Sequence, residues 1–136
     1  MISFTILGQP CSKANSRRLV QIAGRPAFIK SAEALAYERS ALPQIPRAAR
    51  QRLQGKLRLT AWIYYVSERP DLDASLIRDV LQDRYAKTKR GSRVLVQAGV
   101  YLNDRQVREE HYYHAIDKKN PRAEIEVELI DAELPL

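Results

Sequence analysis

The chain has 136 residues, of which 45% are apolar and 29% charged, and this balance excludes an intrinsically disordered protein. Its length suits one compact domain, and no stretch approaches the roughly 20 apolar residues that a membrane-spanning helix needs. The formal net charge of +7 favours a polyanionic partner, and the single cysteine excludes an internal disulfide and fits a reducing, cytoplasmic setting.

The N-terminal part of the chain predicts strands followed by a helix. Apolar and polar residues alternate over residues 2–7, which is typical of a half-buried strand. Residues 19–29 predict a short hairpin that turns near Gly24. Ser31 is a candidate N-cap for a helix, which the prolines at positions 43 and 46 end or kink. Residues 47–53 predict a second, basic helical piece.

The strongest strand prediction covers residues 57–66, which are apolar on both faces and therefore belong in the middle of a sheet. Trp62 lies inside this strand and is predicted to be a core residue. A proline then breaks the chain, and the spacing of apolar residues between 76 and 81 predicts a helix. The segment between strand and helix contains Asp73 and Ser75, the two candidate caps of that helix.

The C-terminal part predicts an exposed loop and two closing strands. Residues 84–93 carry five cations and a glycine, which favours an exposed loop. Residues 107–116 and 123–129 predict strands, and in the second one glutamates alternate with apolar residues, which is typical of one buried and one solvated face. The whole pattern predicts a single α/β (α+β) domain over residues 1–136, with a mixed β-sheet flanked by helices.

Basic residues cluster in two segments without acids, residues 1–30 and residues 84–93. Such segments attract polyanions over long distances and release counterions from a nucleic acid on binding. An ordinary solvated basic surface is the alternative interpretation of each segment. The candidate DNA-binding residues are Lys13, Asn15, Arg17, Arg18, Arg84, Lys87, Lys89, Arg90 and Arg93.

Three aspartates stand out against this basic background. Asp71 and Asp73 are two residues apart, a spacing that in extended backbone points both side chains to the same side. Asp104 follows an apolar segment, and we expect it to reach the same end of the sheet. Carboxylates are preferred ligands of Mg²⁺, which activates water for attack on a phosphodiester. The cluster therefore predicts a metal-dependent nuclease, with a turn and helix cap as the alternative interpretation of the Asp71–Asp73 spacing.

Three segments carry a family resemblance. They are the basic loop at residues 12–18 (SKANSRR), the junction at residues 69–78 (RPDLDASLIR) and the block at residues 98–107 (AGVYLNDRQV). In this order they resemble the RusA family of Holliday junction resolvases. Members are small homodimers that bind four-way DNA junctions and nick two opposed strands using Mg²⁺. The resemblance implies a RusA-like fold, Mg²⁺ (with Mn²⁺ as a substitute) at Asp71, Asp73 and Asp104, and no small-molecule cofactor.

The chain also departs from the family pattern. Ala74 and Ser75 stand where the family has an asparagine, and Arg78 takes the place of its lysine when one inserted residue is allowed. A guanidinium neutralises phosphate charge but does not act as a base. Asn103 replaces the first aspartate of the family's pair and offers a metal an uncharged oxygen. Residues 84–98 look longer than the usual link, and we interpret them as a DNA-contacting flap.

These features predict a cytoplasmic, homodimeric, Mg²⁺-dependent endonuclease that resolves branched DNA, with Asp71, Asp73, Asp104 and Asn103 at the metal and Arg78 stabilising transition-state charge. Two alternatives stay open. The first is a junction- or RNA-binding module of the same fold that no longer cuts, which the departures from the family pattern favour. The second is a basic structural protein of the ribosomal type, whose carboxylates are turn residues.

Overall fold

The apolar strand β4 (Leu57–Tyr65) lies inside a four-stranded sheet of order β1-β8-β4-β7. The computed structural model describes residues 1–68 and 72–130. β4 pairs in antiparallel fashion with β8 (Arg122–Leu129) and in parallel with β7 (Val107–Ile116), while β1 (Ile2–Leu7) pairs with β8. The sheet is therefore mixed, and the predicted α+β class and interior position of this strand are confirmed.

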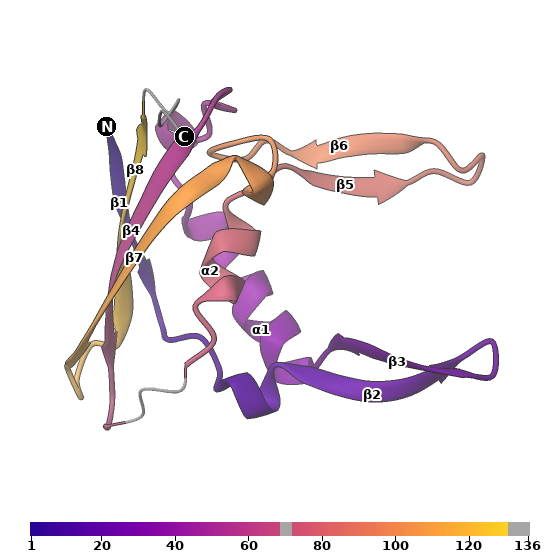
Figure 1. Ribbon diagram of the computed structural model, residues 1–136, viewed down its shortest axis with the longest axis horizontal. Helices are drawn as coiled ribbons and strands as arrows, with labels where there is room; N and C mark the ends of the chain where they lie inside the picture. Colours follow the sequence, from indigo (N-terminus) through magenta and orange to yellow (C-terminus); the bar gives the residue numbers. More distant parts are fainter. Residues whose placement is uncertain (69–71, 131–136) are drawn as a thin grey trace, which may run out of the picture.

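Two helices, α1 (Ala32–Ala41) and α2 (Ser75–Val80), lie against one face of this sheet (Figure 1). The core forms between them, because every second residue of β4 from Leu57 onward is buried. The residues between these are only half-buried. Trp62 is one of them, and its ring stacks on that of Tyr113 from β7. The prediction that Trp62 is a core residue is therefore wrong, because no described helix covers the second face.

The helices follow their predicted caps only in part. Ser31 caps α1, since its Oγ accepts a hydrogen bond from the Ala34 N–H at 3.1 Å. The expected basic helix over residues 47–53 is reduced to a single 3₁₀ turn, Arg47–Ala49. Ala74 occupies the N-cap position of α2, one residue after Asp73. Among the described residues, no helix is long and apolar enough to cross a membrane.

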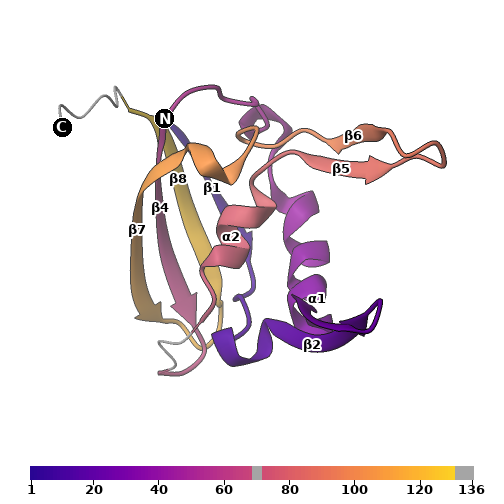
Figure 2. The same cartoon turned by 45° about the vertical axis from the view of Figure 1, so that its right-hand side comes forward.

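Two hairpins extend from the side of the molecule that carries the helices (Figures 1 and 2). The first pairs β2 (Arg17–Ile22) with β3 (Arg25–Lys30), as predicted, and turns through Ala23 and Gly24, both with positive φ. The second pairs β5 (Arg84–Lys87) with β6 (Arg93–Gln97). Residues 84–93 were expected to be a loop, and most of them belong to this hairpin instead. The apolar residues of β6 lie opposite β5 and give it a strand to pair with.

The segment that follows β6 packs tightly against the end of α2. A Cβ on Gly99 would lie 2.4 Å from the carbonyl carbon of Gln82, so only glycine fits here. The buried carboxylate of Asp83 accepts hydrogen bonds from the Gly99 N–H at 2.8 Å and from the Arg52 guanidinium at 2.9 Å. Burial alone would raise the pKa of Asp83, but the bonds from Arg52 and Gly99 lower it below its ordinary value.

We expect Asp83→Asn to lower the free energy of unfolding by about 2 kcal/mol at neutral pH, because a buried neutral amide replaces the carboxylate that accepts charge-assisted hydrogen bonds from Arg52 and from the Gly99 N–H. A group whose pKa is depressed on folding stabilises the protein above its unfolded-state pKa, and this contribution is lost as the pH falls through the folded-state value. The difference between wild type and variant, measured by urea titration, should therefore be constant from about pH 5 to 7 and shrink below about pH 4. A difference that persists unchanged at pH 2 contradicts this role.

Candidate nucleic-acid interface and acidic pocket

Two hairpins form a pair of cationic arms, which we define as arm 1 (residues 17–30) and arm 2 (residues 84–97). Neither arm contains an aspartate or glutamate. Most of their cations are exposed, in a position to meet phosphate groups. The exposed cations of the arms are Arg17, Arg18, Arg25, Lys87, Lys89, Arg90 and Arg93. Lys13 and Asn15 are also exposed, on the 3₁₀ turn that precedes arm 1.

Arg84, the remaining predicted DNA contact, is half-buried and has a different position. Its guanidinium forms ion pairs with Glu38 of α1 and, at 3.4 Å, with Asp79 of α2. Lys30, the last residue of arm 1, pairs with the same two carboxylates, at 3.4 Å in the case of Glu38. We call these four residues the anchor cluster. It fastens the bases of both arms to both helices, so Arg84 holds arm 2 in place rather than facing solvent.

Glu38 is the most buried member of the anchor cluster, with a side chain only 8% exposed. A buried carboxylate is costly unless charged groups compensate it, and here Lys30 and Arg84 do so from opposite arms. The two acids and two cations are thus neutral as a set. The cluster requires both arms to be in place at once, and it therefore sets their separation.

The arms also expose apolar side chains. On arm 1, Leu19 and Phe28 are opposite each other across the two strands, and Phe28 is 74% exposed. On arm 2, Val96 is 62% exposed. Two-stranded hairpins are marginally stable in water without a covering layer. The arms therefore have the properties of surfaces that contact another molecule.

A pocket of about 280 Å³ opens between the start of α2, the strand β7 and the loop before arm 1. It combines two carboxylates, Asp73 and Glu110, with two cations, Lys13 and Arg78. Its remaining lining residues are Leu72, Ala74, Ser75, Tyr112 and His114. The predicted site residues Asp73 and Arg78 are thus brought together with Lys13, which is far from them in sequence.

Asp73 is buried at the rim of α2 and its carboxylate is held by hydroxyl and amide donors. Its Oδ1 accepts hydrogen bonds from the Ser75 hydroxyl and, at 3.1 Å, from the Ser75 N–H. Burial raises the pKa of Asp73, but the bonds from Ser75 and Ser16 and the nearby charge of Arg17 lower it, and the net shift is downward. Asp73 is therefore a carboxylate at neutral pH, and no basic side chain of the described residues pairs with it directly.

Arg78 connects Asp104 to this pocket. Its NH1 lies 2.5 Å from Glu110 Oε1, and its Nε lies 3.8 Å from Asp104 Oδ2. Asp104 does not line the pocket itself. Glu110 and Asp104 thus flank the Arg78 guanidinium, which supplies positive charge beside the pocket where the sequence predicted a metal ion.

Asn103 has a local structural role. Its side chain accepts a hydrogen bond from the Arg105 N–H at 2.8 Å, and the Gln106 side chain accepts one from the Asn103 N–H at 2.9 Å. Asn103 lines a separate hollow beside Gly55 and not the pocket of Asp73. The remaining predicted ligand, Asp71, lies outside the described residues.

The donors in the pocket fit one kind of metal site. No three histidine, cysteine, aspartate or glutamate side chains of the described residues converge on a point. Asp73 and Glu110 nevertheless line one pocket, and Mg²⁺ is often held by one or two protein carboxylates, with water and substrate phosphate as its other ligands. The residues present therefore suit a Mg²⁺ ion that arrives with its substrate.

The sequence interpretation did not assign three residues of the pocket, Glu110, Tyr112 and His114, to the site. They are every second residue of β7 and so share one face of the strand. The strand itself was predicted, so this alternation was the available signal. Which face would meet α2 could not be read from it, because both faces of β7 are mostly polar. Burial raises the pKa of Tyr112, which stays a neutral hydrogen-bonding group at physiological pH.

Comparisons with known proteins identify no family for this chain, so its function is inferred from the arrangement of the arms and the pocket. No protein-family model matches this chain, and no curated protein matches its sequence.

We expect Glu38→Gln to loosen both arms, because Lys30 and Arg84 then compete for Asp79 alone. Amide hydrogens at the arm bases should exchange faster, and the free energy of unfolding should fall by about 1–3 kcal/mol. Glu33→Gln is the matched control, since Glu33 is an exposed residue on the same helix and its loss changes the net charge equally. Equal exchange in the two variants contradicts the anchoring role.

Proposed function

We propose that this protein is a Mg²⁺-dependent endonuclease that binds four-way DNA junctions and cuts their phosphodiester backbone. The observation that carries the proposal is the pair of acid-free cationic arms on the same molecule as an acidic pocket with an ionised aspartate. Cations gather and orient a polyanion, whereas the Asp73 carboxylate, which pairs with no cation of the described residues, repels a phosphate unless a divalent ion intervenes. The arms supply binding and the pocket supplies chemistry.

Two separate arms are better suited to a branched DNA substrate than one straight binding groove would be. They leave the helix side of the molecule separately, with α1 and α2 between their bases (Figure 1). Each arm therefore has its own path to a phosphate backbone, as two duplex segments meeting at a junction require. The anchor cluster maintains their separation, so the protein selects DNA by shape through backbone contacts rather than by base sequence.

In the pocket, each described side chain has a defined part. A bound Mg²⁺ activates water and offsets charge on the phosphate. Asp73 holds the ion, and the hydrogen bonds from Ser75 keep its carboxylate charged and oriented. Lys13 contacts the neighbouring phosphate. Arg78, kept in place by Glu110, stabilises the charge that develops as the backbone breaks. Asp71 belongs to the proposal as a second ligand.

Resolution of a junction requires two cuts, and a homodimer provides two sites related by a two-fold axis. The exposed apolar residues of the arms, such as Phe28 and Val96, support self-association because burying them removes apolar surface from water. The cytoplasm, where such DNA occurs and where Cys11 stays reduced, is the proposed location.

A second candidate function is junction binding without cleavage. It is favoured by Arg78, whose guanidinium already pairs with Glu110 and lies near Asp104. A protein that compensates its own carboxylates in this way needs less metal. In this candidate the arms have the same role, and only the chemistry is absent.

Asp73→Asn separates the two candidates. We expect it to lower the rate of nicking of a labelled four-way junction with Mg²⁺ by at least about a hundredfold, because the ligand charge is lost. Junction affinity should stay the same or rise, since a negative charge is removed, and Asn retains the acceptor for Ser75. Asp117→Asn, far along the chain in the turn after β7, is the control and should cut normally. Binding without any nicked product from wild type, in Mg²⁺ or Mn²⁺, supports the second candidate and overturns the first.

Neutralising arm 2 tests the binding surface. We expect replacement of its four exposed cations by Gln to weaken junction affinity by about a hundredfold at low salt and to reduce the salt dependence of binding. The control removes equal charge at four exposed arginines outside the arms. The arm variant changes Lys87, Lys89, Arg90 and Arg93, and the control changes Arg39, Arg47, Arg105 and Arg108. Equal loss in both variants means that net charge, not the arm, binds DNA.

A further inference from the structure

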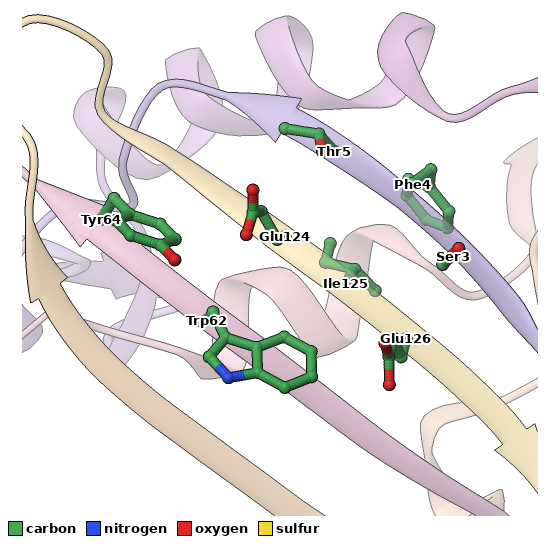
Figure 3. A pocket seen from close by; sticks show the side chains of 8 residues that line it. All are labelled: Ser3, Phe4, Thr5, Trp62, Tyr64, Glu124, Ile125 and Glu126. Atoms are coloured by element: carbon green, nitrogen blue, oxygen red, sulfur yellow. The ribbon is translucent and has the colours of Figure 1, made fainter.

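The face of the main sheet that turns away from the helices differs in chemistry from the rest of this basic protein. We define the aromatic–acidic face by five residues, Trp62, Tyr64, Tyr113, Glu124 and Glu126. They come from the neighbouring strands β4, β7 and β8, and Figure 3 shows the four from β4 and β8. All are at least partly exposed, and no described helix covers them.

The aromatic rings of this face form a platform. Trp62 and Tyr113 stack with ring centroids 5.8 Å apart and planes inclined by 17°. Next to them, the guanidinium of Arg122 lies 3.9 Å from the centre of the Tyr64 ring. The face thus already holds one cation against an aromatic ring, which is the contact that an incoming arginine makes.

The carboxylates of the face are not all compensated. Glu124 pairs with Arg122 at 3.3 Å. Farther along the sheet, Arg58 pairs with both Glu109 and Glu128. Glu126 has no ion pair within the described part of the chain, and its cross-strand neighbours are the uncharged Thr60 and Ser3.

A pocket of about 370 Å³ lies at this uncompensated carboxylate. Trp62 and Tyr64 line one side, Glu124 and Glu126 line its middle, and β1 closes the other side (Figure 3). Its size is within the range of small-ligand sites. Aromatic rings beside two neighbouring carboxylates recognise a cation that is also flat and apolar on its faces, and a guanidinium has these properties.

We propose that the aromatic–acidic face docks an arginine-containing peptide segment of a partner protein. One arginine stacks on Trp62 and donates hydrogen bonds to Glu126. The argument is charge complementarity: this is the place in the described structure where aromatic surface and a carboxylate without a counterion coincide in a chain of net charge +7.

Other occupants fit less well. A nucleic acid brings phosphates, which Glu124 and Glu126 repel. A second copy docked face to face brings the same two carboxylates into opposition. A second copy whose arm docked on this face would not form a closed dimer. The arms and the face are on opposite sides of the molecule, so this contact would repeat head to tail from one copy to the next (Figure 1). A partner on this face leaves both arms free, and the inference does not rest on the proposed function.

Trp62 is the only tryptophan of the chain, so its fluorescence reports on this face alone. The probe is a capped tetra-arginine peptide, titrated at low salt into the full-length protein, with tetra-lysine and tetra-glutamate peptides as comparisons. We expect a saturable change with tetra-arginine, severalfold weaker binding of tetra-lysine, and none of tetra-glutamate. Glu126→Gln should weaken tetra-arginine binding by about tenfold. Glu33→Gln, which removes an exposed carboxylate from α1, should not change it.

Three results overturn the proposal. The first is the absence of a saturable change with tetra-arginine in wild type, with circular dichroism confirming the fold. The second is equal weakening by Glu126→Gln and Glu33→Gln, which indicates attraction to overall charge. The third is self-association of the wild type in sedimentation that Glu126→Gln abolishes, which assigns the face to a second copy.

Discussion

The arrangement of this protein depends on one buried carboxylate with two counterions. Glu38 sits on α1 and pairs with Lys30 from the end of one arm and Arg84 from the start of the other, while Asp79 of α2 completes the set. Removing either cation leaves negative charge in a poorly solvated place, so the folded state favours having both arms docked. Two hairpins that are marginal by themselves thereby acquire a fixed origin and separation. The geometry of the cationic surface follows from this pairing.

The anchor cluster also divides the molecule into two chemical sides. The arms carry acid-free cationic surface on the helix side, whereas the uncovered sheet face carries aromatic rings and the uncompensated Glu126. The pocket at Asp73 lies between these regions, where α2 meets β7. Under the two proposals above, this division allows one small domain to bind a polyanion and a cationic peptide at once, because the acid-free arms and the carboxylates Glu124 and Glu126 are on opposite sides of the molecule.

Local sequence patterns predicted the structure correctly where a residue's role depends on its own strand or helix alone. Alternation predicted β1 and β8, a run that is apolar on both faces predicted β4, and Ser31 was identified as the cap of α1. The same patterns gave wrong predictions where a residue's burial or ion pairs depend on a neighbouring element. Trp62 is apolar and central, yet its side of the sheet has no described covering layer, and Arg84 belongs to a basic stretch but pairs with two helices. Asn103 resembled a ligand, while its observed hydrogen bonds are those of a capping box.

The sequence by itself determined the α+β class, the strands of the main sheet, the acid-free character of residues 1–30 and 84–93, and the presence of isolated aspartates among cations. These properties depend on composition and short-range periodicity, which are local. Only the tertiary structure decided that Lys13, Asp73, Arg78 and Glu110 share a pocket, that Arg78 lies between Glu110 and Asp104, and that Glu126 has no ion pair with another described residue. Which charges meet depends on how distant elements pack, and packing is a property of the whole chain.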